Sequence, residues 1–180
     1  KYVINTHFHF DHAHGNQMLP EDVKIISHTL TRDLIAAGES KRGRSYESFV
    51  GSLPDRITAL EQQLASAMDD STKSVLQNRI SYQKNYKDAT DAVIPRAPNE
   101  IFTKKLQYKF GDRLIQILFL GRAHTGGDAV VFLPEEKILI TGDLLTAGIS
   151  YLGDSYPQEW VKTLDRVKAL DFDMVLPGDG

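Results

Sequence analysis

The segment that most constrains this chain is residues 6–16, THFHFDHAHGN, which holds four of its six histidines. It follows directly on residues 2–5, whose short apolar run predicts a buried strand. Gly15 and Asn16 then supply residue types that are typical of turns. The sequence therefore predicts that these histidines lie on a loop at the end of a strand.

Side chains alternate between the two faces of an extended segment, which would give this loop a metal-binding face. We expect His7, His9 and Asp11 to point to one side, whereas Phe8 and Phe10 point to the other. Neutral imidazole nitrogen and carboxylate oxygen are ligands of zinc and other borderline metals. A solvated polar loop is the alternative, and the alternation of apolar and ligand-type residues argues against it.

Three further residues could complete such a site. His12 lies where the strand turns, so its side chain could serve a second ion beside Asp11. His124 occupies a turn, GRAHTGGD, between two apolar strands and fits a further ligand position. Asp143 ends the apolar strand ILITGD, where a buried carboxylate needs a partner, and its two oxygens could bridge two ions. Each residue alone is more often a structural hydrogen-bonding group, so the prediction depends on the ordered set.

The rest of the sequence predicts an α/β fold with a helical insertion at residues 39–98. Polar residues 39–46 precede two amphipathic helices, which begin near Pro54 and after residues 69–71 and would form a hairpin. The hairpin could cover an active site, mediate dimerisation or only elaborate the fold. Strands are expected at 2–5, 23–27, 101–104, 106–110, 114–120, 129–133, 137–141 and 174–176, and further helices at 29–37 and 156–170.

Composition limits the classes of protein and partner. The 180 residues fit a single domain, residues 1–180, and a net charge of -3 does not favour nucleic acid as a partner. The absence of cysteine excludes disulfides, thiolate zinc sites and a cysteine nucleophile. Since there is neither a signal peptide nor an apolar run of the roughly 20 residues that span a bilayer, we expect a soluble protein without membrane partners. The compartment stays open.

The order HxHxDH at residues 7–12, then HTGGD at 124–128, then TGD at 141–143 resembles the metallo-β-lactamase superfamily. The resemblance implies an αβ/βα sandwich with a metal centre at one edge, here partial and carrying the inserted hairpin. The ligands that it implies are His7, His9 and His124 for a first ion, and Asp11 and His12 for a second, with Asp143 bridging the two.

Two departures from that family pattern affect what we expect. The family usually presents a last histidine in a PGHG setting, whereas residues 177–180 read PGDG. Asp179 could take the vacant place and favour manganese or iron over zinc, or it could be a turn residue in a chain that binds one ion. Family members also carry strands before the histidine cluster, so we expect part of one sheet to be missing and a homodimer to be an option.

The resemblance and the ligand set together predict a metal-dependent hydrolase. A metal lowers the pKa of bound water to about 7, so a metal-bound hydroxide could cleave an ester, thioester, lactone or β-lactam-type bond in a small-molecule substrate. Asp11 is the expected catalytic residue, since it could orient the nucleophile or carry a proton to the leaving group. With an aspartate as the bridging residue, the chain looks more like the glyoxalase II and general hydrolase branches than the true β-lactamases.

Two other functions remain open at this point. One is an oxidoreductase similar to the mononuclear iron persulfide dioxygenases of the same superfamily, and the other is a non-catalytic metal-binding domain. The expected cofactor is therefore one or two zinc ions, with iron or manganese as alternatives.

Overall fold

Two β-sheets form the frame of the computed structural model, which describes residues 1–179. The first sheet is parallel and contains, in spatial order, β1 (Tyr2–Ile4), β2 (Lys24–His28) and β3 (Glu100–Phe102). The second contains, in spatial order, β4 (Lys105–Phe110), β5 (Arg113–Phe119), β6 (Ala129–Leu133), β7 (Ile138–Thr146) and β8 (Met174–Gly178). Its neighbours are antiparallel except for the parallel pair β7–β8.

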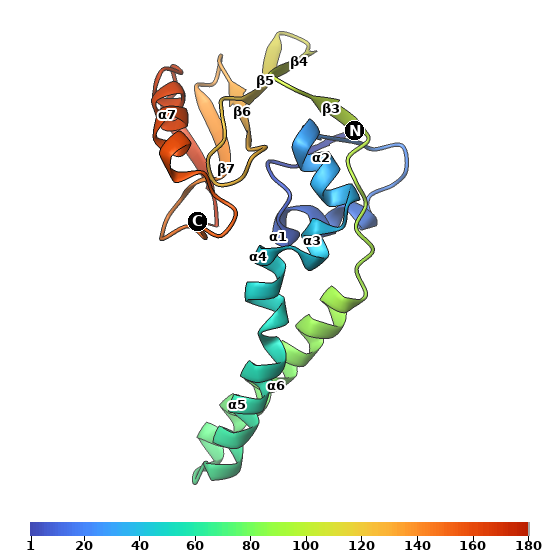
Figure 1. The fold of residues 1–180 in the computed structure, drawn as a ribbon, viewed down its shortest axis with the longest axis vertical. Helices are drawn as coiled ribbons and strands as arrows, with labels where there is room; N and C mark the ends of the chain where they lie inside the picture. The colour runs from blue at the N-terminus through green and yellow to red at the C-terminus, as the bar shows by residue number, and fades with distance from the viewer. Residues whose placement is uncertain (180) are drawn as a thin grey trace.

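The central strands of the second sheet, β5 to β7, are buried on both faces because their side chains alternate between two apolar clusters. Leu118 and Val130 pack with Val167 of helix α7 (Pro157–Lys168), which covers the outer face of this sheet (Figure 1). The side chain of Ile117 points to the opposite face and packs against Ile26 of the parallel sheet, in a separate cluster between the two sheets. The layers are therefore helix, sheet and sheet, and the predicted α/β fold class is confirmed.

Short helices fill the connections around the parallel sheet. They are α1 (Phe10–Ala13), the 3₁₀ turn η1 (His14–Met18), α2 (Thr29–Ala36), α3 (Glu39–Arg42), α4 (Arg44–Tyr46) and the π-helical turn η2 (Glu47–Gly51). His28 precedes α2, and its side chain accepts a hydrogen bond from the Leu30 backbone amide. That bond satisfies one of the free N–H groups at the start of the helix.

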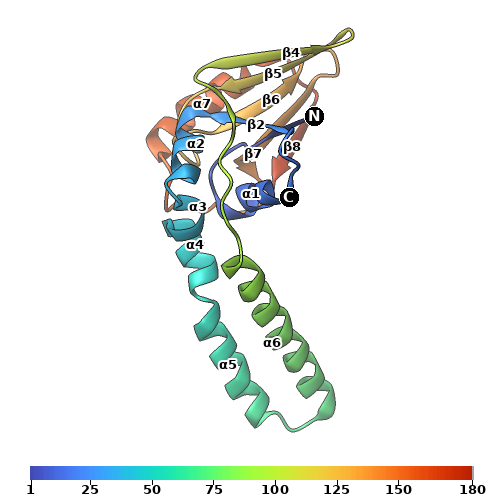
Figure 2. The same ribbon diagram turned by 90° about the vertical axis from the view of Figure 1, so that its right-hand side faces the viewer.

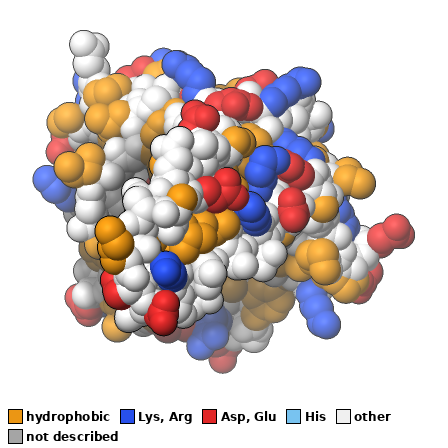
Figure 3. Space-filling model, turned by 90° about the horizontal axis from the view of Figure 1, so that it is seen from below, with side chains coloured by type: hydrophobic (Ala, Val, Ile, Leu, Met, Phe, Trp, Pro, Cys, Tyr) orange, Lys and Arg blue, Asp and Glu red, His pale blue; other side chains and the backbone are white. Residues whose placement is uncertain are grey.

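Two longer helices, α5 (Leu53–Ser66) and α6 (Asp70–Asp91), project from the sheets as an antiparallel pair (Figure 2). Ile57 and Leu60 of α5 pack on Leu76 and Ile80 of α6 in a cluster of their own. Asp69 caps α6 by accepting a hydrogen bond from the Thr72 amide at 2.7 Å. Seen from below, acidic, basic and apolar side chains are interspersed on this face of the molecule (Figure 3).

The base of this pair is attached to the histidine-bearing loop. Phe10 of α1 packs with Tyr46, Val50 and Leu53 in one buried cluster. The segment at the start of the insertion therefore lies against the loop that carries the candidate ligands. Among the described residues, no helix combines the length and the apolar character that crossing a bilayer would require.

Candidate metal centre

Three histidines from two distant segments converge at the edge between the sheets. His7 and His9 follow β1, and His124 lies in the turn between β5 and β6. Nδ1 of His9 lies 3.1 Å from Nε2 of His124, and one ring nitrogen from each of the three lies within 4.8 Å of the others. His7 and His124 are each 1% exposed, so this cluster is shielded from bulk water.

The loop after β1 is closed by a pair of asparagine side chains. Asn5 and Asn16 exchange side-chain hydrogen bonds of 2.8 and 3.1 Å, and Asn5 also donates to the His12 carbonyl at 2.9 Å. His9 is extended, and the following backbone turns at once into α1. The expectation of an extended segment is therefore wrong from Phe10 onward, because the closed loop requires a helical turn there.

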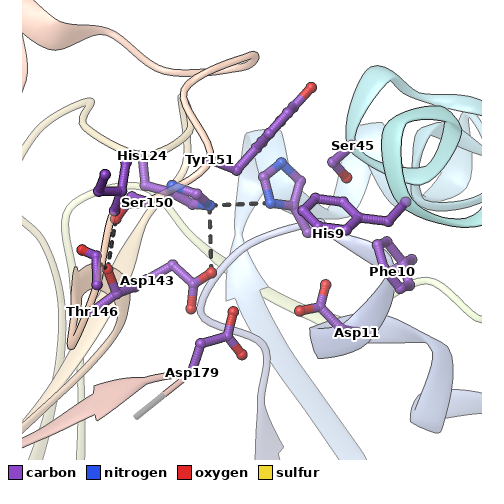
Figure 4. Close-up of a pocket in the computed structure, with 13 residues that line it drawn as sticks. His9, Phe10, Asp11, Ser45, His124, Asp143, Thr146, Ser150, Tyr151 and Asp179 are labelled. Atoms are coloured by element: carbon purple, nitrogen blue, oxygen red, sulfur yellow. Dashed lines mark hydrogen bonds and ion pairs between the residues drawn. The ribbon is translucent and has the colours of Figure 1, made fainter.

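The helical turn still directs the expected side chains toward the cluster. Nε2 of His12 lies 3.2 Å from Oδ2 of Asp11 and 3.2 Å from Oδ1 of Asp143. His7, His12 and Asp143 form a second group with ligand atoms within 4.8 Å of one another, and Asp11, His12 and Asp179 form a third. All seven residues expected from the sequence are thus brought together. Figure 4 shows five of them, His9, Asp11, His124, Asp143 and Asp179.

Asp143 reaches this position because β7 is irregular where it carries the residue. The pairing of β7 with β8 shifts register on both sides of Gly142, whose φ of 51° is in the left-handed region that favours glycine. Gly178 at the end of β8 lies so close that an added Cβ would overlap Oδ1 of Asp143. The two glycines allow the ends of these strands to meet beside the carboxylate.

A metal ion fits this donor set, as the free ligand atoms show. Nε2 of His7 is buried and has no hydrogen-bond partner among the described residues. Nε2 of His12 and Oδ1 of Asp143 are also buried without a hydrogen bond, and their only link is the ion-pair contact of 3.2 Å between them and the contact of His12 with Asp11. Buried polar atoms without partners are costly, and most such atoms in proteins are satisfied. Imidazole nitrogens and carboxylate oxygens in this number match zinc, iron or manganese.

The electrostatics divide the site into two parts. Burial, together with the charges of neighbouring histidines, holds the pKa of His7 well below its ordinary value and lowers the pKa of His124 to about 4. Burial also disfavours the charged form of His12, but the carboxylates of Asp11 and Asp143 raise its pKa to about 10. His7 and His124 are therefore neutral at neutral pH and can donate a lone pair, as metal ligation requires, whereas His12 would have to release a proton when a metal binds.

Asp179 lies on the acidic side of the centre. Burial, followed by the negative charges of Asp143 and Asp11, raises the pKa of the Asp179 carboxyl. Carboxylates that crowd one another in this way are stabilised by a shared cation.

One residue that contacts the candidate site, Asp154, was not predicted from the sequence. Oδ2 of Asp154 lies 3.2 Å from Nε2 of His9, and Oδ1 of Asp154 lies 3.2 Å from Nε of Arg44 in α4. Donation of the Nε2 proton to Asp154 leaves Nδ1 of His9 as the nitrogen that faces His124. Asp154 comes from an irregular loop, and no periodicity or motif in the sequence points to it.

The turn that carries His124 is held by Asp128. Its carboxylate accepts hydrogen bonds from the Thr125 amide at 2.9 and 3.0 Å and from the Thr125 hydroxyl at 2.6 Å. Thr125 and Asp128 thus stabilise the turn and lie behind the cluster. His14, whose Nε2–H donates to the Ser40 carbonyl at 2.7 Å, likewise lies beside the site and not in it.

A pocket of about 220 Å³ opens onto the centre. Figure 4 shows His124, Thr146 and Ser150 on one side of it and Ser45 and Phe10 on the other, with Tyr151 between them. Asp11, Asp143 and Asp179 line its acidic part. The start of the helical insertion thus forms part of the pocket wall. The sequence alone had left open whether the insertion contributes to the site.

Comparison with known sequences places these features in a family. A model described as the metallo-beta-lactamase superfamily matches residues 1–179. The type 2 metallo-beta-lactamase of Bacteroides fragilis is 35% identical over 89 residues, which cover 46% of this chain and 36% of that protein. The alpha subunit of 2,4-dinitroanisole O-demethylase from Nocardioides sp. (strain JS1661) is 21% identical over 179 residues, covering 98% of this chain and 39% of that subunit. The chain therefore spans less than two fifths of the length of either relative.

Solved structures share the fold at low sequence identity. A metallo-beta-lactamase from Pontibacter korlensis superimposes with a TM-score of 0.62 and 19% identity, covering 100% of this chain and 61% of that one. The protein TTHA1623, solved in a di-iron-bound form, gives a TM-score of 0.57 and 20% identity, covering 99% of this chain and 69% of that one.

Proposed function

This chain belongs to the metallo-β-lactamase superfamily, and we propose that it is a metal-dependent hydrolase of an ester, thioester, lactone or β-lactam-type bond in a small molecule. The observation that carries the proposal is the convergence of buried histidine and aspartate atoms that lack hydrogen-bond partners beside an open pocket. A binding site that only stabilised the fold would have no need of this opening.

We assign the ligands in two groups. His7, His9 and His124 would hold one ion, and Asp11, His12 and Asp179 a second, with Asp143 between them. Zinc is the first choice, and the carboxylate-rich second group makes iron or manganese the alternatives. When bound, such ions lower the pKa of water and polarise the bond under attack.

The chain's own residues would supply orientation and proton transfer. Asp11 is partly exposed at the pocket, and although burial alone would raise its pKa, the contact with His12 brings the pKa below its ordinary value. Asp11 is therefore ionised at neutral pH, and it would accept the proton of the attacking water and pass it toward the leaving group. The histidines behind it are buried, so the centre is reached through the pocket.

The names of the relatives are consistent with a small substrate. One relative is called a metallo-beta-lactamase and another a subunit of 2,4-dinitroanisole O-demethylase. A structural neighbour was solved with two iron ions, which supports a test of iron besides zinc.

The test combines metal content with turnover. The protein is loaded separately with zinc, iron and manganese, its metal content is measured, and each form is assayed on neutral esters, thioesters, lactones, β-lactams and aryl methyl ethers. We expect hydrolysis of at least one class, loss of it with a chelator or in His124→Ala, and retention of it in Asp165→Asn, an exposed position on α7.

Other outcomes would assign a different function. Full metal occupancy without turnover of any compound would contradict the hydrolase and leave a metal-binding domain. Oxygen consumption by the iron form with glutathione persulfide, in the absence of hydrolysis, would instead indicate the dioxygenase activity.

A further inference from the structure

One part of the pocket wall, beside the candidate metal ligands, is apolar. Phe49 of η2 is 47% exposed, and Ile149, in the loop after β7, is 98% exposed. The ring of Tyr151 lies edge-to-face with that of Phe49, with 6.0 Å between their centroids. Exposed apolar side chains that gather at a pocket are typical of a binding surface.

This wall is held in place from both sides. The Phe49 ring lies 6.3 Å from that of Phe10, which belongs to the buried cluster at the base of the hairpin. The Tyr151 ring lies 5.7 Å from that of His9, again edge-to-face. The apolar wall therefore adjoins the candidate metal centre directly, at a distance that one substrate can span.

The charges that line the pocket disfavour an anionic group at the apolar wall. The residues that line it include three aspartates but neither lysine nor arginine. Arg44, although next to Ser45 in the chain, does not line this pocket and pairs with Asp154. An anionic group against the apolar wall would thus lose its hydration without gaining a counterion, which is costly.

The wall offers one unused polar group. The hydroxyl of Ser45 is buried and has no hydrogen-bond partner, and Ser45 lines the pocket (Figure 4). A substrate oxygen beside the apolar group could satisfy it.

Building on the proposed hydrolase function, we propose that Phe49, Ile149 and Tyr151 form a subsite for an uncharged aromatic group of the substrate, with the Ser45 hydroxyl as its hydrogen-bonding group. The preferred substrate is then a neutral arylalkyl ester or thioester, and an anionic one is disfavoured. The helical insertion contributes to specificity because it carries Phe49 and Ser45.

A thioester series tests this with a uniform leaving group. S-ethyl thioesters of acetic, phenylacetic and 4-carboxyphenylacetic acid are compared, each kcat/KM being divided by the rate of alkaline hydrolysis of the same compound. Thiol release can be followed with a thiol reagent without background, since the chain contains no cysteine. We expect the phenylacetyl compound to exceed both the acetyl and the carboxylated compounds by about tenfold or more.

Substitutions at Phe49 test whether this residue causes the preference for the phenylacetyl compound. We expect Phe49→Ala to reduce the phenylacetyl-to-acetyl ratio to near one and Phe49→Leu to retain part of it, because leucine keeps apolar area at the same place. Tyr82→Ala, an exposed aromatic on α6 outside the pocket, should leave all rates unchanged. An equal rate for the three compounds, or a preference that persists in Phe49→Ala, would overturn the subsite.

A binding measurement distinguishes an error in the subsite proposal from an error in the proposed hydrolase function. If no thioester is cleaved at full metal occupancy, the subsite is judged by NMR titration with 2-phenylethanol, a neutral probe, and the proposed function fails only if the esters, lactones and β-lactams are also left intact. Saturable binding that Phe49→Ala weakens by about tenfold supports the subsite in either case, and binding that is equal in both proteins rejects it.

Discussion

Asp154 connects the helical insertion to a candidate metal ligand through its contacts with Arg44 and His9. Because it fixes the ring orientation and tautomer of His9, we expect Asp154→Ala to weaken zinc affinity by about 10- to 100-fold in competition with a chelator. Asp165→Ala, on the exposed side of α7, is the matched control. Unchanged affinity in Asp154→Ala would show that this carboxylate does not support the ligand.

His28 gives a pH dependence that is separate from the metal centre. Burial lowers its pKa in the folded chain, and its side chain caps α2 by accepting from the Leu30 amide. The unfolded chain therefore binds a proton more readily than the folded one below pH about 6.5, so this contribution to the free energy of unfolding is present above that pH and is lost as the pH falls.

The matched variant for this effect is His28→Asn, which can still cap the helix but does not titrate. Denaturant unfolding is measured between pH 7.5 and 5. Over this range the free energy of unfolding of the wild type should fall by up to about 1 kcal/mol more than that of His28→Asn. Parallel pH profiles for the two proteins would contradict the assignment.

At the level of elements, the α5–α6 pair has its own apolar cluster and projects from the sheets. We expect Ile80→Ala to destabilise the pair locally, by about 2–4 kcal/mol. Hydrogen exchange should then accelerate in Leu53–Ser66 and Asp70–Asp91 while the amides of β5 and β6 keep their protection. Tyr82→Ala is the control, and an equal acceleration in the sheets would show that the pair unfolds only with the whole molecule.

Elements with a clear hydrophobic period could be predicted from the sequence. The strand at residues 129–133 and the turn at Gly111 and Asp112 are confirmed, because alternation and turn residues are local signals. The inward face of α6 could not be predicted in this way, since Leu76 and Ile80 are buried whereas the equally apolar Val75 and Tyr82 are exposed. A long helix with apolar residues on two faces leaves that choice to its partner helix.

The candidate ligands were recognisable because they sit in a specific ordered motif at strand ends. The helical turn at Phe10–Ala13 was not, since it depends on the contact between Asn5 and Asn16 across the loop. Asp154 was not either, because its contact with His9 joins residues 145 positions apart and lies in a loop without periodicity. Local sequence patterns thus predict which residues form such a site more readily than they predict how the chain brings those residues together.

In the whole molecule, the candidate ligands come from both sheets. His7, His9, Asp11 and His12 follow β1 of the parallel sheet, whereas His124, Asp143 and Asp179 belong to the strands and turns of the other. A bound ion would therefore join the two layers at their common edge, and the buried atoms without partners would become its ligands.

The most direct measurement is an anomalous difference map from crystals grown with saturating zinc and collected on both sides of the zinc edge. We expect one peak surrounded by His7, His9 and His124, and a second beside Asp11, His12 and Asp179, with Asp143 between them. Zinc bound elsewhere, with these histidines free of metal, would contradict the assignment of this edge as the metal centre.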